Sequence, residues 1–254
     1  MSILKKILNY IPRPILIRMS KWVRPFLDLF YRGNKYTDPI NQKSYRKFLP
    51  YGYVKIRENV LSPGTLSLER HRLLWLYLQN ETDLLDKKLK VLHLAPEQAF
   101  YKTFKKNKNW NYITTDLYSP LADVKADITQ LPFKNDSFDL IFCNHVLEHI
   151  KDDKKAMQEL YRVMKPGGIG FFQVPLDQNR QISFEDDSIT DPQERTRIFG
   201  QYDHVRVYGM DYFDKLKKVG FEVNPADYSA KLKEEEIEKY RLEKGELLPV
   251  VIKK

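Results

Sequence analysis

Residues 127–175 read DITQLPFKNDSFDLIFCNHVLEHIKDDKKAMQELYRVMKPGGIGFFQVP, and this stretch decides the fold. Residues 137–143 form a short, mostly apolar run, which is typical of a strand buried on both faces. From residue 152 onward, apolar residues recur every three or four positions, which predicts a helix that residues 165–168 end. Residues 169–174 then predict another strand. The stretch therefore predicts a strand–helix–strand unit.

Four short motifs occur in this stretch in a fixed order and spacing. They resemble the second half of a class I S-adenosylmethionine-dependent methyltransferase, of the branch often called methyltransferase type 11. The resemblance implies an α/β fold: a Rossmann-like, doubly wound, mostly parallel seven-stranded sheet, with S-adenosyl-L-methionine as cofactor. The motifs are D-x-x-x-L-P-F at 127–133, S-F-D at 137–139, H-V-L-E-H at 145–149 and R-V-x-K-P-G-G at 162–168.

Length and composition set the broad class. The 254 residues suffice for one α/β domain with an appendage, and 42% are hydrophobic, enough for a sizeable core. The single cysteine, Cys143, excludes an internal disulfide framework and suits a reducing compartment. No apolar run approaches the roughly 20 residues that span a bilayer. We therefore expect a cytoplasmic protein.

Positive charge is concentrated at the N-terminus. Residues 1–57 hold thirteen Lys and Arg against two Asp, whereas the whole chain carries +9, so the remainder is slightly acidic. The basic character therefore does not belong to the presumed catalytic part. This argues against a nucleic-acid groove there, and we expect no nucleic-acid partner.

The first thirty residues have an amphipathic pattern. Apolar residues of 2–11 and 15–30, including Trp22 and Phe26, fall on one helical face with Lys and Arg between them. A basic amphipathic helix with aromatic residues can lie on an anionic membrane, which would make the protein peripheral to the inner membrane face. Packing of this segment on the catalytic domain or on a second subunit is the slightly favoured alternative. The sequence does not determine the oligomeric state.

Residues 33–66 contain two similar tetrapeptides, Asp-Pro-Ile-Asn and Ser-Pro-Gly-Thr. Their surroundings resemble a bacterial methyltransferase subfamily with a small zinc ribbon, in which Cys-Pro-x-Cys stands at both places. Here the four ligand positions are Asp38, Asn41, Ser62 and Thr65, a poor set for structural zinc. We expect a ribbon-shaped element without metal. The predicted division is 1–32 (basic segment), 33–66 (ribbon-like element) and 67–254 (methyltransferase domain).

Residues 89–94 predict the first strand of the catalytic sheet. In the family, the turn after this strand is rich in glycine, so that the cofactor can approach the backbone. The turn here, residues 95–99, contains no glycine. Small Ala95 could still allow close approach, Pro96 pre-sets the turn, and Glu97 could accept from the amino-acid moiety of the cofactor.

Residues 111–115 and 123–128 predict the next two strands, and an acidic residue stands near the end of each. Asp116 lies 19 positions after Glu97, a spacing that suits an acceptor for both ribose hydroxyls. Asp127 would accept from the adenine amino group, with Ile128 against the ring. The complete set of expected cofactor-binding residues is Ala95, Pro96, Glu97, Asp116, Leu117, Asp127, Ile128, Asn144 and His145.

Methyl transfer requires a nucleophile about 3 Å from the methyl carbon, and a base if that nucleophile carries a proton. His204 lies in a polar region expected to cover the acceptor, and it is the main candidate for this base. His149 is the second catalytic candidate, although cofactor-side packing or capping is favoured for the pair His145 and His149. No thiolate completes that pair, so we expect no metal. The expected acceptor-binding residues are Asp203, Arg206 and Tyr208.

Ser67 is predicted to cap a helix that runs to about residue 79. Asp191 and Pro192 predict another helix start, and residues 211–219 predict a helix that Gly220 ends. The sixth strand is expected from residue 221 and an antiparallel seventh at 247–252.

Two further clusters have plain structural interpretations. The charged run at 69–72 is expected to be a solvated helix face rather than an acceptor site, and the run at 231–244 a solvated helix without chemistry. The predicted function is transfer of a methyl group to a small-molecule or lipid- or sugar-like acceptor. The alternative is a non-catalytic S-adenosylmethionine-binding or scaffolding protein, because the glycines and thiolates of the relatives are missing.

Overall fold

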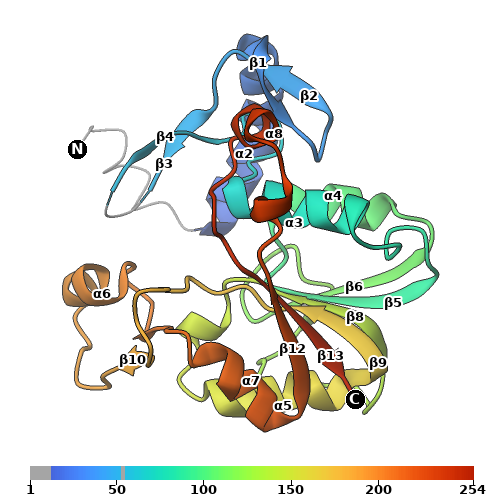
Figure 1. Cartoon of the computed structure of the whole chain (residues 1–254), viewed down its shortest axis with the longest axis vertical. Coiled ribbons are helices and arrows are strands. Elements are labelled where there is room, and N and C mark those ends of the chain that lie inside the picture. Colours follow the sequence, from blue (N-terminus) through green and yellow to red (C-terminus); the bar gives the residue numbers. More distant parts are fainter. Residues whose placement is uncertain (1–12, 53–54) are drawn as a thin grey trace.

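The computed structural model describes residues 13–52 and 55–254, with side chains from residue 22 onward. Its centre is a seven-stranded sheet in the order β12-β13-β9-β8-β5-β6-β7 (Figure 1). Only β13 runs antiparallel to its neighbours, which confirms the predicted Rossmann-like fold. The strands are β5 (Leu89–Leu94), β6 (Trp110–Asp116), β7 (Val124–Lys125), β8 (Phe138–Cys143), β9 (Met164–Phe171), β12 (Phe221–Ala226) and β13 (Leu248–Lys253).

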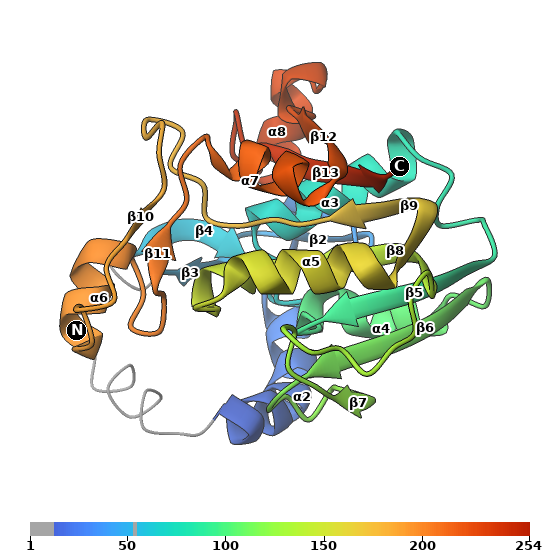
Figure 2. The ribbon, with the colours of Figure 1, turned by 90° about the horizontal axis from the view of Figure 1, so that it is seen from below.

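Helices cover both faces of the sheet. On one side lie α3 (Glu69–Asn80) and α4 (Gln98–Lys106), and on the other α5 (Asp153–Val163) and α7 (Tyr212–Val219) (Figures 1 and 2). Each pair buries apolar residues against the sheet: Leu74 and Phe104 on the first face, Leu160 and Leu216 on the second. Burial of these two helix faces is the main driving force for the doubly wound arrangement.

The predicted strand–helix–strand unit is present as β8, α5 and β9. Asp152 caps α5 by accepting a hydrogen bond from the Lys155 N–H at 2.9 Å. The expected turn at 165–168 is instead part of β9, which starts at Met164 directly after the helix. A Cβ on Gly168 would lie 2.8 Å from the Lys165 carbonyl oxygen, so the chain needs glycine at this close approach.

Two other element boundaries differ from the prediction. The third strand, expected at 123–128, is only β7, because Asp127 accepts from Thr129 and turns the chain. The expected cap of α3, Ser67, instead donates its hydroxyl to Asp38. The N–H of the actual cap, Leu68, donates to His71 Nδ1 at 2.9 Å.

A helix and two small hairpins precede the catalytic sheet. They are α2 (Arg13–Phe30), the hairpin of β1 (Arg32–Asp38) and β2 (Lys43–Tyr45), and the hairpin of β3 (Leu49–Tyr51) and β4 (Arg57–Leu61). They lie on the α3 side of the molecule beside α8 (Glu234–Tyr240) (Figure 1). Within the described residues, no helix is long and apolar enough to cross a membrane.

The two tetrapeptides of the ribbon-like element come together around Asp38. This carboxylate is fully buried and accepts hydrogen bonds from the Ile40 N–H (3.0 Å), the Ser67 hydroxyl (3.0 Å) and the Thr65 hydroxyl. The first tetrapeptide thus contacts the second through hydrogen bonds to a carboxylate. Of the four positions at which the similar subfamily carries cysteines, Asp38 and Thr65 are joined by a hydrogen bond, whereas the buried Ser62 hydroxyl has no partner among the described residues.

Arg72 connects this element to the catalytic domain. Its side chain is fully buried and donates to four backbone carbonyls, those of Val60, Ser67, Tyr240 and Arg241, at 2.6–2.9 Å. These carbonyls belong to β4, to the start of α3 and to the end of α8. The expectation that 69–72 is a solvated face is therefore wrong, because most of this run is buried at the junction.

The segment after β9 carries α6 (Pro192–Phe199) and a small ladder of β10 (Phe184–Glu185) and β11 (Arg206–Val207). As predicted, Asp191 caps α6 with Pro192 at its first position. A short 3-10 helix, η1 (Leu147–His149), lies between β8 and α5, and another, η2 (Ser229–Lys231), precedes α8. The η1 segment and the region around β11 are neighbours in space.

Candidate cofactor site and acceptor pocket

The turn after β5 adopts the backbone conformation that glycine usually supplies. Ala95 has φ +46°, in the left-handed region, and its N–H donates to the Thr115 carbonyl at 2.8 Å. Pro96 is buried directly after it. The turn is therefore held close to the end of β6. Compared with glycine, Ala95 adds only one methyl group at this position.

Asp116 at the end of β6 has a geometry that suits a ribose. Its Oδ1 accepts from the N–H groups of Tyr118 and Ser119, both at 2.6 Å, which fixes the carboxylate. Its Oδ2 accepts no hydrogen bond from the described residues and stays available. Beside it, the buried hydroxyl of Thr115 also has no partner among them. Such free acceptors next to an open turn fit the ribose of S-adenosylmethionine.

The remaining predicted adenine-side residues lie around the same edge of the sheet. Asp127 is exposed, and its Oδ1 already accepts from the N–H and hydroxyl of Thr129 at 2.8 Å. Ile128 is buried, whereas Leu117 is 45% exposed. Leu117 thus offers an open apolar surface beside Asp116, which suits one face of a planar base.

Glu97 is surrounded by hydrogen-bond donors. Its Oε2 lies 2.9 Å from His93 Nε2 and 3.4 Å from Asn144 Nδ2, and its Oε1 lies 3.2 Å from His71 Nε2. His71 Nδ1 accepts from the Leu68 N–H, so the proton of this imidazole is on Nε2, facing Glu97. The carboxylate that we expected to face the cofactor is therefore already held by histidines.

The pKa values of this group follow from burial and these contacts. Burial opposes ionisation of Glu97, but the adjacent imidazoles of His71 and His93 outweigh it and hold its pKa well below the usual range. Burial lowers the pKa of His71 to about 4. At neutral pH the group is a carboxylate that accepts from a neutral imidazole, a fixed negative charge beside the cofactor turn.

A pocket of about 290 Å³ opens next to this group. The pocket and the Glu97 group are adjacent in the chain. Arg70 and His145 line the pocket, and their sequence neighbours His71 and Asn144 contact Glu97. Nine of the fourteen lining residues are polar or charged. The lining is Arg57, Glu69, Arg70, His145, Gln173, Val174, Pro175, Leu176, Gln178, Glu243, Lys244, Gly245, Glu246 and Leu247.

Gln173 is the most unusual residue of this pocket. Its side chain is 2% exposed, and neither its amide nitrogen nor its amide oxygen has a partner among the described residues. The Nε of Arg70 is also buried without one. Buried polar groups without partners are costly and rare in native proteins. These groups are therefore the expected donors and acceptors for a bound molecule.

Glu246 gives the pocket a second titratable group. Burial raises its pKa to about 7, Arg70 opposes the rise, and Glu243 and Glu69 add to it. The run 231–244 that we expected to be a solvated helix is helical only in α8, and its end forms part of the pocket wall. One signal for the pocket is visible in the sequence: the polar Gln173 near the end of an apolar run.

His145 has a strained backbone at the entrance to this pocket. Its φ is +53°, unusual for a residue with a side chain, and its N–H donates to the Gln173 carbonyl at 2.7 Å. Its Nδ1 lies 3.2 Å from Glu148 Oε1. His145, which was predicted to bind the cofactor, thus lines this pocket next to Gln173.

The two candidate catalytic histidines lie together but outside the lining of this pocket. The rings of His149 and His204 meet edge to face, with centroids 4.8 Å apart. His204 is buried, and its Nδ1 lies 3.0 Å from the Phe199 carbonyl oxygen. Asp203 contacts His149 through its carbonyl and its carboxylate, at 3.3 and 3.5 Å.

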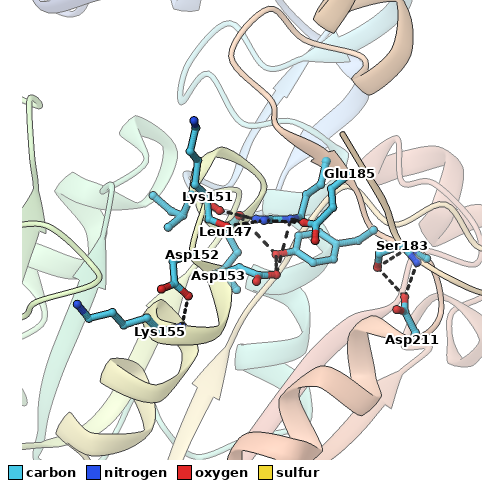
Figure 3. A network of polar contacts seen from close by, with 12 residues as sticks. Leu147, Lys151, Asp152, Asp153, Lys155, Ser183, Glu185 and Asp211 are labelled. Atoms are coloured by element: carbon cyan, nitrogen blue, oxygen red, sulfur yellow. Dashed lines mark hydrogen bonds and ion pairs between the residues drawn. The ribbon is translucent and has the colours of Figure 1, made fainter. Parts of the chain in front are cut away.

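Arg206 and Tyr208 are engaged within the protein, contrary to the expected acceptor contact. Arg206 is 3% exposed and donates to the carbonyls of Leu147, Ile150 and Lys151 and to the Glu185 carboxylate. The Tyr208 hydroxyl donates to Asp153 at 2.7 Å. Figure 3 shows this network of η1 and the start of α5. Both side chains hold these segments together and have no exposed group for an acceptor.

Comparisons with known proteins agree with this architecture. Residues 80–172 match a family described as methyltransferase domain. A demethylmenaquinone methyltransferase of Streptomyces avermitilis is 41% identical over 64 residues, 25% of this chain and 23% of that protein. A 2-phytyl-1,4-naphtoquinone methyltransferase of Nostoc punctiforme is 43% identical over 47 residues, 18% of this chain and 20% of that one. The chain thus matches less than a quarter of the length of each relative.

Among solved structures, the [4+2]-cyclase SpnF is 16% identical with a TM-score of 0.48, covering 92% of both chains. An S-adenosylmethionine-dependent methyltransferase of Mesorhizobium loti is 15% identical with a TM-score of 0.46, covering 71% of this chain and 98% of that one. The match to the methyltransferase domain family thus covers residues 80–172, and the order of the sheet agrees with the Rossmann-like fold expected from the sequence.

Proposed function

We propose that the protein transfers a methyl group from S-adenosylmethionine to a small polar acceptor bound in the pocket beside His145. The observation that carries this proposal is Gln173, whose buried amide has no partner among the described residues of a pocket next to the cofactor turn. When bound, S-adenosylmethionine supplies an electrophilic methyl group. The residues of the chain bind the acceptor, orient it and exclude water.

The charge of the pocket supports a polar acceptor. Arg57 lies 2.7 Å from Glu69 and 3.3 Å from Glu243, and Arg70 stands opposite the partly buried Glu246. The relatives are named for quinone acceptors, and an isoprenoid chain would leave these charges and the Gln173 amide without partners. A site with buried polar groups discriminates strongly against molecules that cannot pair with them.

A methyl-transfer assay tests this function. The protein is incubated with S-adenosylmethionine and a panel of hydroxylated, amino and carboxylated small molecules, with naphthoquinone head groups as the apolar arm, and S-adenosylhomocysteine is measured. We expect turnover with a polar acceptor. We also expect Gln173→Leu to lower kcat/KM at least ~10-fold, because the leucine loses both hydrogen bonds. The matched variant Gln130→Leu, on an exposed turn, should keep full activity.

Two results would reject parts of this proposal. Turnover with naphthoquinones alone would reject the polar acceptor. Tight binding of S-adenosylmethionine without turnover of any panel member or cell extract would favour the second candidate, a non-catalytic binding or scaffolding protein. That candidate is supported by the turn at 95–99, which lacks glycine.

The exposed part of α2 supports a further proposal, peripheral contact with an anionic membrane. Arg46 stacks over Phe30 at 4.6 Å from the ring centroid, and Lys47 lies near Tyr31. Exposed aromatic residues next to cations suit the interface of an anionic bilayer. Of the residues expected on this face, Ile7 and Leu8 lie outside the described part. The exposed side chains are Trp22 (81%), Phe26 (76%), Leu29 (67%) and Phe30 (67%).

A further inference from the structure

Three side chains with metal-binding atoms converge beside the pocket. Glu148 and His149 belong to η1, and His204 follows α6 more than fifty positions later. One ligand atom from each lies within 4.8 Å of the other two. The Val205 N–H donates to the Glu148 carbonyl at 2.9 Å, so the backbone fixes His204 next to the other two residues.

Glu148 is a buried carboxylate without adequate partners. Its side chain is almost fully buried, and neither oxygen accepts a hydrogen bond of good geometry from the described residues. The nearest group is His145 Nδ1, 3.2 Å from Oε1. Burying a carboxylate costs several kcal/mol unless it is paired with a charge or coordinates a metal.

Both histidines are oriented as metal ligands usually are. The Nδ1 of His204 faces the Phe199 carbonyl at 3.0 Å, and the Nδ1 of His149 faces the Asp203 carbonyl at 3.3 Å. A carbonyl oxygen only accepts, so each Nδ1 carries the proton and each Nε2 has a free lone pair. This second contact, which fixes the tautomer of the ring, accompanies almost every metal-bound histidine.

The Arg206 network holds the same two segments in place. Arg206 donates to the Leu147 carbonyl, directly before Glu148, and to those of Ile150 and Lys151, directly after His149. Figure 3 shows these contacts around Leu147, Lys151 and Glu185. The backbone on both sides of Glu148 and His149 is therefore anchored to the segment that carries His204.

We propose that Glu148, His149 and His204 bind one divalent transition-metal ion of the zinc type. Two imidazoles and one carboxylate are a common set for Zn²⁺, with a fourth position left for water or substrate. Two nitrogen ligands disfavour Mg²⁺ and Ca²⁺. Around a tetrahedral ion the ligand atoms would be about 3.4 Å apart. Because they already lie within 4.8 Å of one another, the three side chains need only a small movement toward one another to bind the ion. No metal was predicted at this place, because no thiolate completes the pair His145 and His149 and the distant His204 was not considered as a third ligand.

The test uses the full-length, tag-free protein after treatment with a chelator. It is titrated with Co²⁺, followed by visible absorption, and then with Zn²⁺ by calorimetry. We expect one ion per chain and the intense ligand-field absorption of a site with low coordination number. His204→Asn and Glu148→Gln should each weaken binding more than ~10-fold, because loss of a direct ligand costs at least as much as loss of its supporting contact.

Control variants distinguish the loss of a metal ligand from the loss of the fold. His71→Asn removes another buried histidine outside the cluster, and its amide oxygen can still accept from the Leu68 N–H, so Zn²⁺ affinity should not change. His149→Ala removes a ligand whose side chain is 28% exposed, which keeps the test valid if the buried variants do not fold. Circular dichroism checks the fold of each variant.

The metal-site proposal is independent of the proposed acceptor. If the wild-type protein binds neither Co²⁺ nor Zn²⁺, or if all three ligand variants bind them as the wild type does, the proposal is wrong. Binding of S-adenosylmethionine is measured separately in metal-free buffer. A failed metal site with intact cofactor binding therefore leaves the methyltransferase proposal standing.

Discussion

Single residues decide the chemistry at the end of the sheet. Glu97 has its carboxylate fixed by two histidines, whereas Asp116 keeps one oxygen free. We therefore expect Asp116, which has a free oxygen, to bind a ribose, and Glu97 to set the local charge. The sequence analysis identified both positions but could not show that the partners of Glu97 are His71, from a distant helix, and His93.

Asp116→Ala should weaken the binding of S-adenosylmethionine by ~10-fold or more, because a charge-assisted contact to the ribose is lost. Calorimetry with S-adenosylmethionine and S-adenosylhomocysteine measures the effect. Asp187→Ala, an exposed position without this role, is the matched control. Equal affinities for wild type and Asp116→Ala would show that Asp116 does not bind the ribose.

Glu246 should make stability depend on pH. Its folded pKa is about 7, above the value of 4.5 for an unperturbed glutamate, so the folded state holds the proton more tightly than the unfolded state. The free energy of unfolding should therefore fall as pH rises from 4.5 to 7. Glu246→Gln should remove this contribution. Urea denaturation of both proteins across that range measures it, and identical pH profiles would contradict the assignment.

At the scale of elements, the regular parts of the fold were predictable and the junctions were not. The first strand and the antiparallel last strand follow from apolar runs, as does α7, which ends at Gly220. The pocket wall at 243–247 could not be predicted, because a charged run looks the same whether it is solvated or folded back against Arg70. His204 was predicted to be the main candidate for a base, but its proximity to Glu148 and His149 depends on tertiary structure.

The Asp38 cluster should be a stability determinant of the ribbon-like element. Asp38→Ala removes the acceptor of three hydrogen bonds in a fully buried site and should lower the free energy of unfolding by ~2–4 kcal/mol. Asp86→Ala, at an exposed turn, is the control. Chemical denaturation compares the variants. A change below ~0.5 kcal/mol for Asp38→Ala would mean that its hydrogen bonds do not stabilise the element.

At the scale of the whole molecule, the N-terminal elements and the catalytic sheet present different surfaces. The start of the chain is basic, and α2 exposes a row of large hydrophobic side chains. Among the described residues, none covers Trp22 or Phe26, which are 81% and 76% exposed. Covering by a second subunit remains distinguishable from membrane contact by experiment.

Sedimentation with vesicles tests the membrane proposal. The protein should sediment with anionic vesicles at low salt and less at high salt, because each nearby Lys or Arg contributes ~1 kcal/mol that salt screens. The double variant Trp22→Ser/Phe26→Ser should bind several-fold more weakly, whereas Ile182→Ser, at another exposed hydrophobic position, should not. No binding by the wild type, together with a dimer that the double variant dissociates, would assign α2 to a subunit interface.

The hydrogen bonds of Arg72 bear on how a molecule can enter the pocket. Its guanidinium joins β4, the start of α3 and the end of α8, three segments that lead directly into opposite sides of the pocket. Opening the pocket by swinging one side outward would break several buried hydrogen bonds at once. We therefore expect the pocket to be preformed and rigid, so that it selects molecules by shape before they bind.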